Sequence, residues 1–226
     1  MVSVAPGTVV VFADIGCPWA HAAIHRFREA RARRGLEDRV TLDVRAFPLE
    51  LYNRRPTPKL ILDAEIPVVG ALAPEAGWQM WQRPEYEYPV TMLPAMEAVH
   101  AAKEQSLRVS EDFDSALRRA FFGESKVVAL RDVLLEIAGT VEGLDVDALA
   151  EALDSGRARR RILEDKRTSE QGGVEGSPHF FFADGTHVHN PGVQMHWEGN
   201  YGRGFPVVDK YDPDVYEDLL DRAAHS

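Results

Sequence analysis

The amino-acid sequence predicts an α/β protein in which a helical segment is inserted between two β-rich ends. A strand, a helix and a second strand are expected within the first 50 residues, and two strands followed by a helix are expected after residue 168. The long stretch between them, residues 51–167, contains no strand pattern. We therefore predict one discontinuous unit with a central mixed sheet, residues 1–50 and 168–226, interrupted by an all-helical unit at 51–167.

The N-terminal unit begins with a short run of β-branched and apolar residues. Residues 8–13 (Thr-Val-Val-Val-Phe-Ala) suit a buried strand. A helix is expected over residues 18–34, because Pro18 fits a first helical turn and Gly35 suits the C-cap. Apolar residues alternate through residues 40–47, which predicts a second strand.

The insertion shows several helical patterns. Helices are expected over residues 92–103, 113–122, 127–138, 146–153 and 157–168. Asp145 should cap the fourth of these and Gly156 should close it. Residues 53–89 are rich in proline and aromatic side chains, and we expect them to be irregular.

The β pattern returns near the C-terminus. Residues 177–182 predict a strand that opens on a proline, Asp184-Gly185 is a hairpin turn signal, and residues 186–189 should form the partner strand. Asp212 as N-cap and Pro213 after it should open a final amphipathic helix.

Composition narrows the class of protein. The chain has 226 residues, 45% of them hydrophobic, and a formal net charge of −10. An acidic chain argues against a nucleic-acid partner and against binding to anionic membranes. No apolar run approaches the roughly 20 residues that span a bilayer, and we see no signal peptide. A single cysteine excludes an intramolecular disulfide, so we expect a cytoplasmic, reduced protein.

That single cysteine, Cys17, stands in Asp-Ile-Gly-Cys-Pro-Trp-Ala, residues 14–20, between the first predicted strand and its helix. A cysteine at a helix N-terminus meets unpaired N–H groups and the positive end of the helix dipole, which favour the thiolate. A fall of its pKa from about 8.5 to about 6.5 would make the thiolate the majority form at neutral pH. His21, one turn along, could assist as a cation or as a proton acceptor, or could simply pack. Cys17 could also be an inert buried core residue.

Four stretches of the chain resemble the DsbA family of thioredoxin-like proteins and its relative, 2-hydroxychromene-2-carboxylate isomerase. Residues 14–19 resemble the family's Asp-x-x-Cys-Pro-Trp-Cys, with Ala20 in place of the second cysteine. Residues 173–180 (Gly-Val-Glu-Gly-Ser-Pro-His-Phe) are similar to its Gly-Val-x-Gly-Val-Pro-Thr-Phe. The closing strand and helix also match. The helical patterns resemble those of the isomerase and FrnE-like subgroup at residues 117–122, 133–138 and 143–145.

The resemblance implies a thioredoxin-like fold with a helical insertion, in which Pro178 is cis and faces Cys17. Pro18 and Trp19 would shape the motif around the nucleophile Cys17. Ala20, Ser177 and Pro178 would line the place where a thiol or substrate binds.

Without an internal resolving thiol, Cys17 could still attack a disulfide-containing substrate, and an external thiol such as glutathione or mycothiol would resolve the mixed disulfide. We expect no tightly bound cofactor. The protein could form a homodimer, which the sequence does not decide. The resemblance to the isomerase offers an alternative, in which a glutathione thiol adds reversibly to a small aromatic substrate. A non-catalytic thioredoxin-fold binding module, with an inert Cys17, is a third hypothesis.

Two further groups of residues invite a functional interpretation. Trp78 and Trp81, with Tyr86 and Tyr88, could form a substrate-binding wall or lid, or a satellite core beneath a long loop; the same alternatives apply to Trp197, Tyr201 and Phe205. Histidines at 179, 187, 189 and 196 could bind a metal together with Cys17. Their spacing matches no tight zinc pattern, so we predict no metal site.

Overall fold

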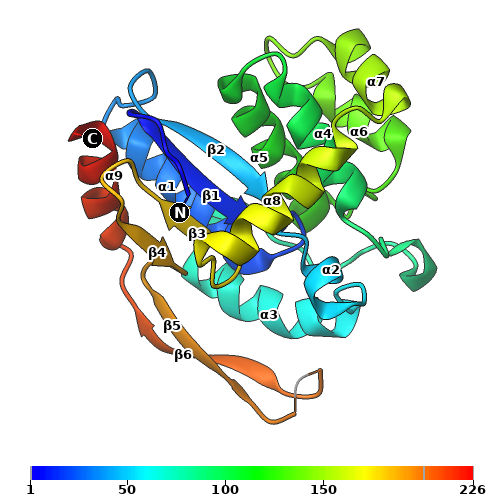
Figure 1. Cartoon of the computed structure of the whole chain (residues 1–226). Coiled ribbons are helices and arrows are strands. Elements are labelled where there is room, and N and C mark those ends of the chain that lie inside the picture. Colours follow the sequence, from blue (N-terminus) through cyan, green and yellow to red (C-terminus); the bar gives the residue numbers. More distant parts are fainter. Residues whose placement is uncertain (1, 201, 226) are drawn as a thin grey trace.

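The computed structural model describes residues 2–200 and 202–225. Its centre is a four-stranded mixed sheet with the order β2-β1-β3-β4 (Figure 1). The strands are β1 (Thr8–Ala13), β2 (Thr41–Ala46), β3 (His179–Phe181) and β4 (His187–His189). β1 pairs in parallel with β2 and antiparallel with β3, and β3 pairs antiparallel with β4. The predicted thioredoxin-like sheet is thus assembled from both ends of the chain.

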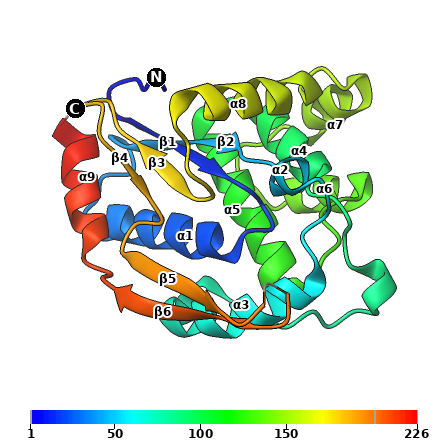
Figure 2. The ribbon, with the colours of Figure 1, turned by 60° about the horizontal axis from the view of Figure 1, so that its bottom comes forward.

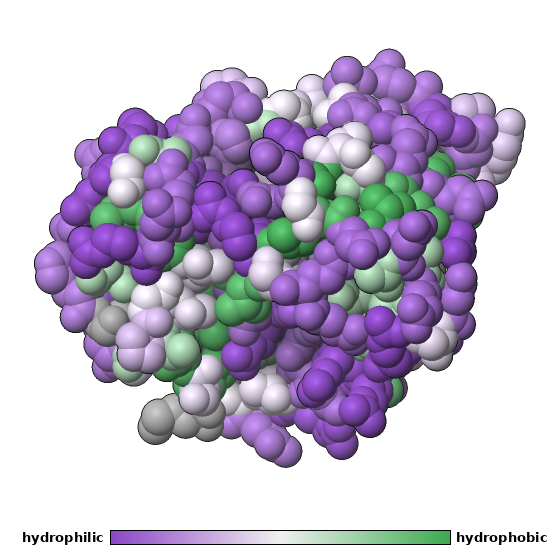
Figure 3. All heavy atoms as spheres, turned by 90° about the horizontal axis from the view of Figure 1, so that it is seen from above, coloured by the Kyte–Doolittle hydropathy of each residue, from purple (hydrophilic) through white to green (hydrophobic). Residues whose placement is uncertain are grey.

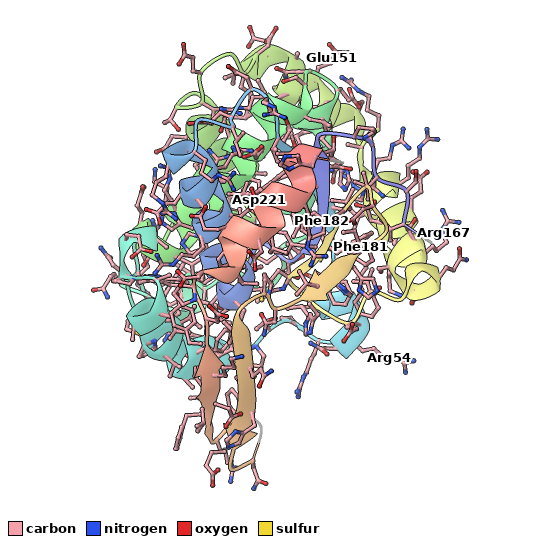
Figure 4. The ribbon with its side chains drawn as sticks, turned by 90° about the vertical axis from the view of Figure 1, so that its left-hand side faces the viewer. Arg54, Glu151, Arg167, Phe181, Phe182 and Asp221 are labelled. Carbon is pink, nitrogen blue, oxygen red and sulfur yellow. The ribbon has the colours of Figure 1, made fainter. Side chains whose placement is uncertain are left out.

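Helices cover both faces of this sheet (Figure 2). α1 (Pro18–Arg33) and α9 (Val215–His225) lie on one face, and α8 (Arg159–Gly172) lies on the other. Neighbouring strand residues point to opposite faces, so Phe182, just after β3, joins the core beneath α1 and α9 whereas Phe181 joins a smaller core on the opposite face (labelled in Figure 4).

The insertion forms a helical bundle around an apolar core to which Ile15 and Ala46 of the sheet unit also contribute. Besides α8, it comprises α4 (Leu93–Lys103), α5 (Leu107–Glu124), α6 (Arg131–Ala138) and α7 (Val146–Ser155). The cap predicted for α7 is present, since the Asp145 side chain accepts a hydrogen bond from Ala148 N at 3.0 Å and Gly156 is left-handed. α5 begins earlier than expected because Ser106 caps it through Val109 N at 3.1 Å.

The expectation that residues 53–89 are irregular is wrong for their first half. α2 (Leu49–Asn53) and α3 (Lys59–Leu72) are helices, followed by two short 3-10 turns, η1 (Pro74–Ala76) and η2 (Glu85–Glu87). α3 keeps Pro67 in its interior, which costs one backbone hydrogen bond. Burial of an apolar face explains why the helix forms nonetheless, and its buried residues recur at helical spacing: Ile61, Leu62, Ile66 and Val69.

A second, two-stranded sheet was not predicted. β5 (Val193–Glu198) and β6 (Phe205–Tyr211) pair antiparallel, with an irregularity between Gln194 and Met195. This hairpin packs against α3 and extends away from the rest of the molecule (Figure 4). None of the described helices is long and apolar enough to cross a membrane.

A buried ion pair ties the insertion to the sheet unit. Glu111 on α5 is 1% exposed, and its carboxylate accepts hydrogen bonds from Arg31 on α1 and from Leu42 N on β2, each at 3.0 Å. Arg28 donates to the same carboxylate at 2.8 Å. The α3 helix also contributes to both cores. The boundary at residue 51 between two units therefore stays a prediction.

We predict that Glu111→Ala lowers the free energy of unfolding by about 3–5 kcal/mol, because it leaves Arg31 charged and buried without its carboxylate partner. Urea unfolding measures the change. Asp112→Ala is the matched control. Asp112 also pairs with Arg28 but is one-third exposed, so its loss should cost no more than about 1 kcal/mol. Equal effects of the two substitutions would contradict this account of the interface.

Candidate active site

Asp14 organises the turn that leads from β1 into α1. Its side chain is buried, and its two carboxylate oxygens accept hydrogen bonds from Gly16 N and Leu49 N, each at 2.8 Å. Its backbone N–H donates to Ser177 Oγ at 2.9 Å, and Arg118 of α5 donates to its carbonyl oxygen at 2.8 Å. Burial raises the pKa of Asp14 to about 6, against the effect of these backbone hydrogen bonds.

Cys17 follows as the N-cap residue of α1 and is 5% exposed. Its thiol donates a hydrogen bond to the carbonyl oxygen of Ser177, with 3.2 Å between Sγ and O. The peptide bond between Ser177 and Pro178 is cis. Residues 160 positions apart in the chain therefore meet at the sulfur. Pro18 opens α1, and Ala20 is fully buried one turn from Cys17, where no second thiol is present.

The pKa of Cys17 lies above that of a free thiol, contrary to the expectation from its place at the helix N-terminus. Burial raises it to about 12, and the negative charges of Glu65 and Asp14 act in the same direction. Ser177 and the backbone N–H of Ala20 lower it, but by less. The resting residue is therefore a protonated thiol at neutral pH.

Glu65 is a neighbour that sequence reasoning missed, because the helix carrying it, α3, was not predicted. Trp19 Nε1 donates to Glu65 Oε1 at 3.0 Å. Burial raises the pKa of Glu65 to about 7 despite this hydrogen bond. The indole of Trp19 thus holds a carboxyl group in the surroundings of Cys17, and the charge of that group depends on pH near neutrality.

His21 does not act as a cation. Its ring stacks on Phe122, with centroids 4.9 Å apart and planes 9° from parallel, and meets Trp78 edge-on at 4.7 Å. Nε2 lies 3.2 Å from the carbonyl oxygen of Ala76, which can only accept, so Nε2 carries the proton. Burial lowers the pKa of His21 to about 3. The ring is neutral at neutral pH and packs in the core.

Most of the predicted aromatic group packs against other side chains, as expected for a satellite core rather than for a lid over Cys17. Trp78 contacts His21 and belongs to both apolar cores. Trp81 packs edge-on against Tyr88 at 5.2 Å, and Tyr88 lines a small cavity that Asp14 also lines. Tyr86 is exposed. A substrate-binding role for Trp78 and Trp81 therefore stays a prediction.

The second aromatic group lies elsewhere. Trp197 and Phe205 are at the end of the β5–β6 hairpin, at or next to its last paired residues, and Tyr201 lies outside the described residues.

Hydrogen bonds account for the histidine cluster on β3 and β4. Glu175, His179 and His187 bring possible metal-ligating atoms within 4.8 Å of one another. However, Glu175 N donates to His179 Nδ1 at 3.0 Å. A neutral His179 must then carry its proton on Nε2, and that atom lies 2.9 Å from His187 Nδ1. The Nδ1 lone pairs of His179 and His187 are therefore both engaged in hydrogen bonds. The expectation of no metal site stays a prediction.

Comparisons with known proteins identify the same type of fold. A family model described as the DSBA-like thioredoxin domain matches residues 8–199. No curated protein sequence matches the chain.

Three solved structures have the same fold. The cytosolic disulfide reductase DsbM from Pseudomonas aeruginosa, solved with GSH, is 17% identical with a TM-score of 0.65, covering 97% of this chain and 100% of that one. A probable DsbA oxidoreductase from Streptomyces coelicolor is 21% identical with a TM-score of 0.68, covering 97% and 90%. A 2-hydroxychromene-2-carboxylate isomerase is 16% identical with a TM-score of 0.57, covering 80% and 87%.

The family model spans most of the chain and includes both Cys17 and the cis-proline loop that accepts its hydrogen bond. This chain belongs to the DsbA-like thioredoxin domain family.

Proposed function

We propose that the protein is a thiol–disulfide oxidoreductase of monothiol type, active in a reducing cytoplasm. One observation carries the proposal. The only thiol of the chain lies at the N-terminus of α1 and donates to the carbonyl oxygen of Ser177, directly before the cis-proline. Membership of a thioredoxin-like family supports a redox role for a cysteine at that position.

The exchange needs two steps. Cys17 attacks a disulfide RSSR′, a bond forms between Cys17 Sγ and one sulfur, and R′ leaves as a thiolate that takes up the proton lost by Cys17. Because Ala20 offers no second thiol, an external thiol R″SH then attacks the mixed disulfide. This releases Cys17 as a thiol and RSSR″ as product. Electrons balance, because one disulfide is consumed and one is formed.

Charge around Cys17 bears on the choice of external thiol. Asp14 and Glu65 both place negative charge near the sulfur. A thiol with little net charge, such as mycothiol, should approach more easily than anionic glutathione. The DsbM structure with GSH supports glutathione as the competing candidate.

We predict that wild-type protein incubated with glutathione disulfide or mycothiol disulfide gains the mass of one half-disulfide, whereas Cys17→Ser gains none. The rate should rise about tenfold per pH unit between pH 7 and 9, because the thiolate is a minor species throughout that range. Intact-mass spectrometry measures both. Unfolded wild-type protein, which should take the adduct readily, shows that the thiol is intact. A folded protein that stays unmodified at pH 9 would contradict the redox role.

We also predict that Cys17 reacts with iodoacetamide without reaching a plateau below pH 10, since its pKa is raised to about 12. Glu65→Gln should speed alkylation at pH 8 several-fold, because removing one negative charge lowers the pKa of the thiol. The amide oxygen of the introduced glutamine can still accept the Trp19 hydrogen bond.

The matched control for this alkylation is Asp63→Asn. Asp63 lies on the same helix, but its carboxylate pairs with Lys59 at 2.6 Å, so its loss should leave the rate unchanged. A rate that levels off near pH 7, or one that Glu65→Gln leaves unchanged, would show that burial and Glu65 do not set the pKa of Cys17.

One observation favours a second candidate function. A protonated Cys17 is a hydrogen-bond donor, and a donor at this position could hold the thiolate of a bound thiol cofactor without a covalent bond. The protein would then be an isomerase or transferase that uses a thiol cofactor on a small aromatic substrate. Full activity of Cys17→Ser on such a substrate would favour this candidate over the first. If neither adducts nor thiol binding are found, the binding-module hypothesis gains.

A further inference from the structure

A cavity that is open to solvent lies in the helical insertion, apart from Cys17. It has a volume of about 830 Å³ and lies between α4, α6, α7 and α8. That volume is within the range of about 300–1,000 Å³ typical of small-molecule sites. Figure 3, which views the molecule from above, shows an apolar patch on the right, the side on which the insertion lies in Figure 1. Cys17, Ser177 and Pro178 are not among the described residues that line the cavity.

The walls of the cavity are mostly aliphatic. Leu134 and Ile162 are buried side chains of its lining, and Leu163 at its edge is 54% exposed. An exposed leucine beside buried ones leaves apolar surface that a ligand could cover.

Glu97 is a buried polar group of this wall that lacks a full set of partners. It projects from α4 and is 6% exposed. Oε2 accepts a hydrogen bond from Arg159 Nε at 3.0 Å. Oε1 is buried and has no hydrogen-bond partner among the described residues. A buried carboxylate oxygen without a donor is costly. Because Oε1 has almost no surface accessible to solvent, a molecule in the cavity would reach it only after a small turn of the Glu97 side chain, and a molecule that brings a donor to Oε1 would be favoured.

Charge at the cavity mouth restricts the chemistry of that molecule. Arg131, Arg159 and Arg160 also line the cavity, and they disfavour an ammonium group. Arg131 is already bound by Asp154, at 2.6 and 2.8 Å, and Glu97 inside the cavity repels a carboxylate. Arg159 pairs with Glu97, and Arg160 lies 3.9 Å from Glu164, so each of the three arginines already has an acidic partner. An uncharged donor fits the apolar wall and Glu97 without displacing any of these ion pairs.

We propose that this cavity is a binding site for an uncharged, largely apolar small molecule that carries one hydrogen-bond donor, such as an alcohol or a phenol. Its donor binds Glu97 Oε1, and its apolar body lies against the leucine and isoleucine side chains of the wall. The site is separate from the redox chemistry proposed for Cys17 and does not depend on it.

The test compares 4-butylphenol with 4-butylanisole, which has the same shape but lacks the donor. Calorimetric titration of the full-length protein should show saturable binding of the phenol, about tenfold or more tighter than that of the ether. Glu97→Met should reduce the preference to less than about threefold. Glu104→Met is the matched control. Glu104 pairs with Arg157 at 2.8 Å just beyond the same helix, and its loss should leave the preference unchanged.

Two further variants separate binding from folding and from the Cys17 site. Leu163→Lys, at an exposed position, should weaken binding of both compounds without lowering the unfolding midpoint. Cys17→Ser should bind the phenol as wild type does. Failure to bind the phenol, equal binding of phenol and ether, or loss of binding in Cys17→Ser would each overturn the proposal, and none of these results would bear on adduct formation at Cys17.

Discussion

The buried carboxylate of Asp14 is the contact on which the architecture of the site depends. It accepts hydrogen bonds from the turn that holds Cys17 and from the start of α2. Its own backbone is held by Ser177 on one side and by Arg118 of the insertion on the other. Four segments far apart in the sequence are thus fixed around one residue. The sulfur can lie 3.2 Å from the Ser177 carbonyl because the chain on both sides of it is held in this way.

In this arrangement two effects act on the pKa of the Cys17 thiol in opposite directions. A helix N-terminus stabilises an anion by about 0.3–1 kcal/mol, and by at most about 2 kcal/mol. Burial can shift a pKa by about 3–5 units, and each unit corresponds to about 1.4 kcal/mol. Burial therefore dominates, and the charges of Glu65 and Asp14 add to it. A lone cysteine at a helix N-terminus is not a thiolate by virtue of that position, and its solvent exposure must be known before reactivity is assigned.

Strand and cap signals are local, so they were sufficient for the four-stranded sheet and for most helices of the insertion. The meeting of Cys17 with the Ser177–Pro178 loop was expected only from the resemblance to the DsbA family, because no local pattern predicts a contact over 160 residues. The sequence was insufficient for α3. Pro67 and the prolines around it obscured a helical apolar face, and Glu65 was missed with that helix. β5 was missed because its alternation of half-buried and exposed residues stands next to glycine-rich turns. The environment of His21 depends on Phe122, about 100 residues away, and no local pattern reports such a contact.

The central claim is that Ala20 makes the resolving thiol an external one, and the variant Ala20→Cys tests it most directly. Wild-type and variant protein would each be loaded once with a labelled disulfide, freed of excess reagent and followed by intact mass. We expect the wild-type adduct to persist until an external thiol is added, whereas the variant expels its adduct by itself and forms a disulfide between residues 17 and 20. A wild-type protein that loses its adduct without added thiol, or a variant that keeps it, would contradict the claim.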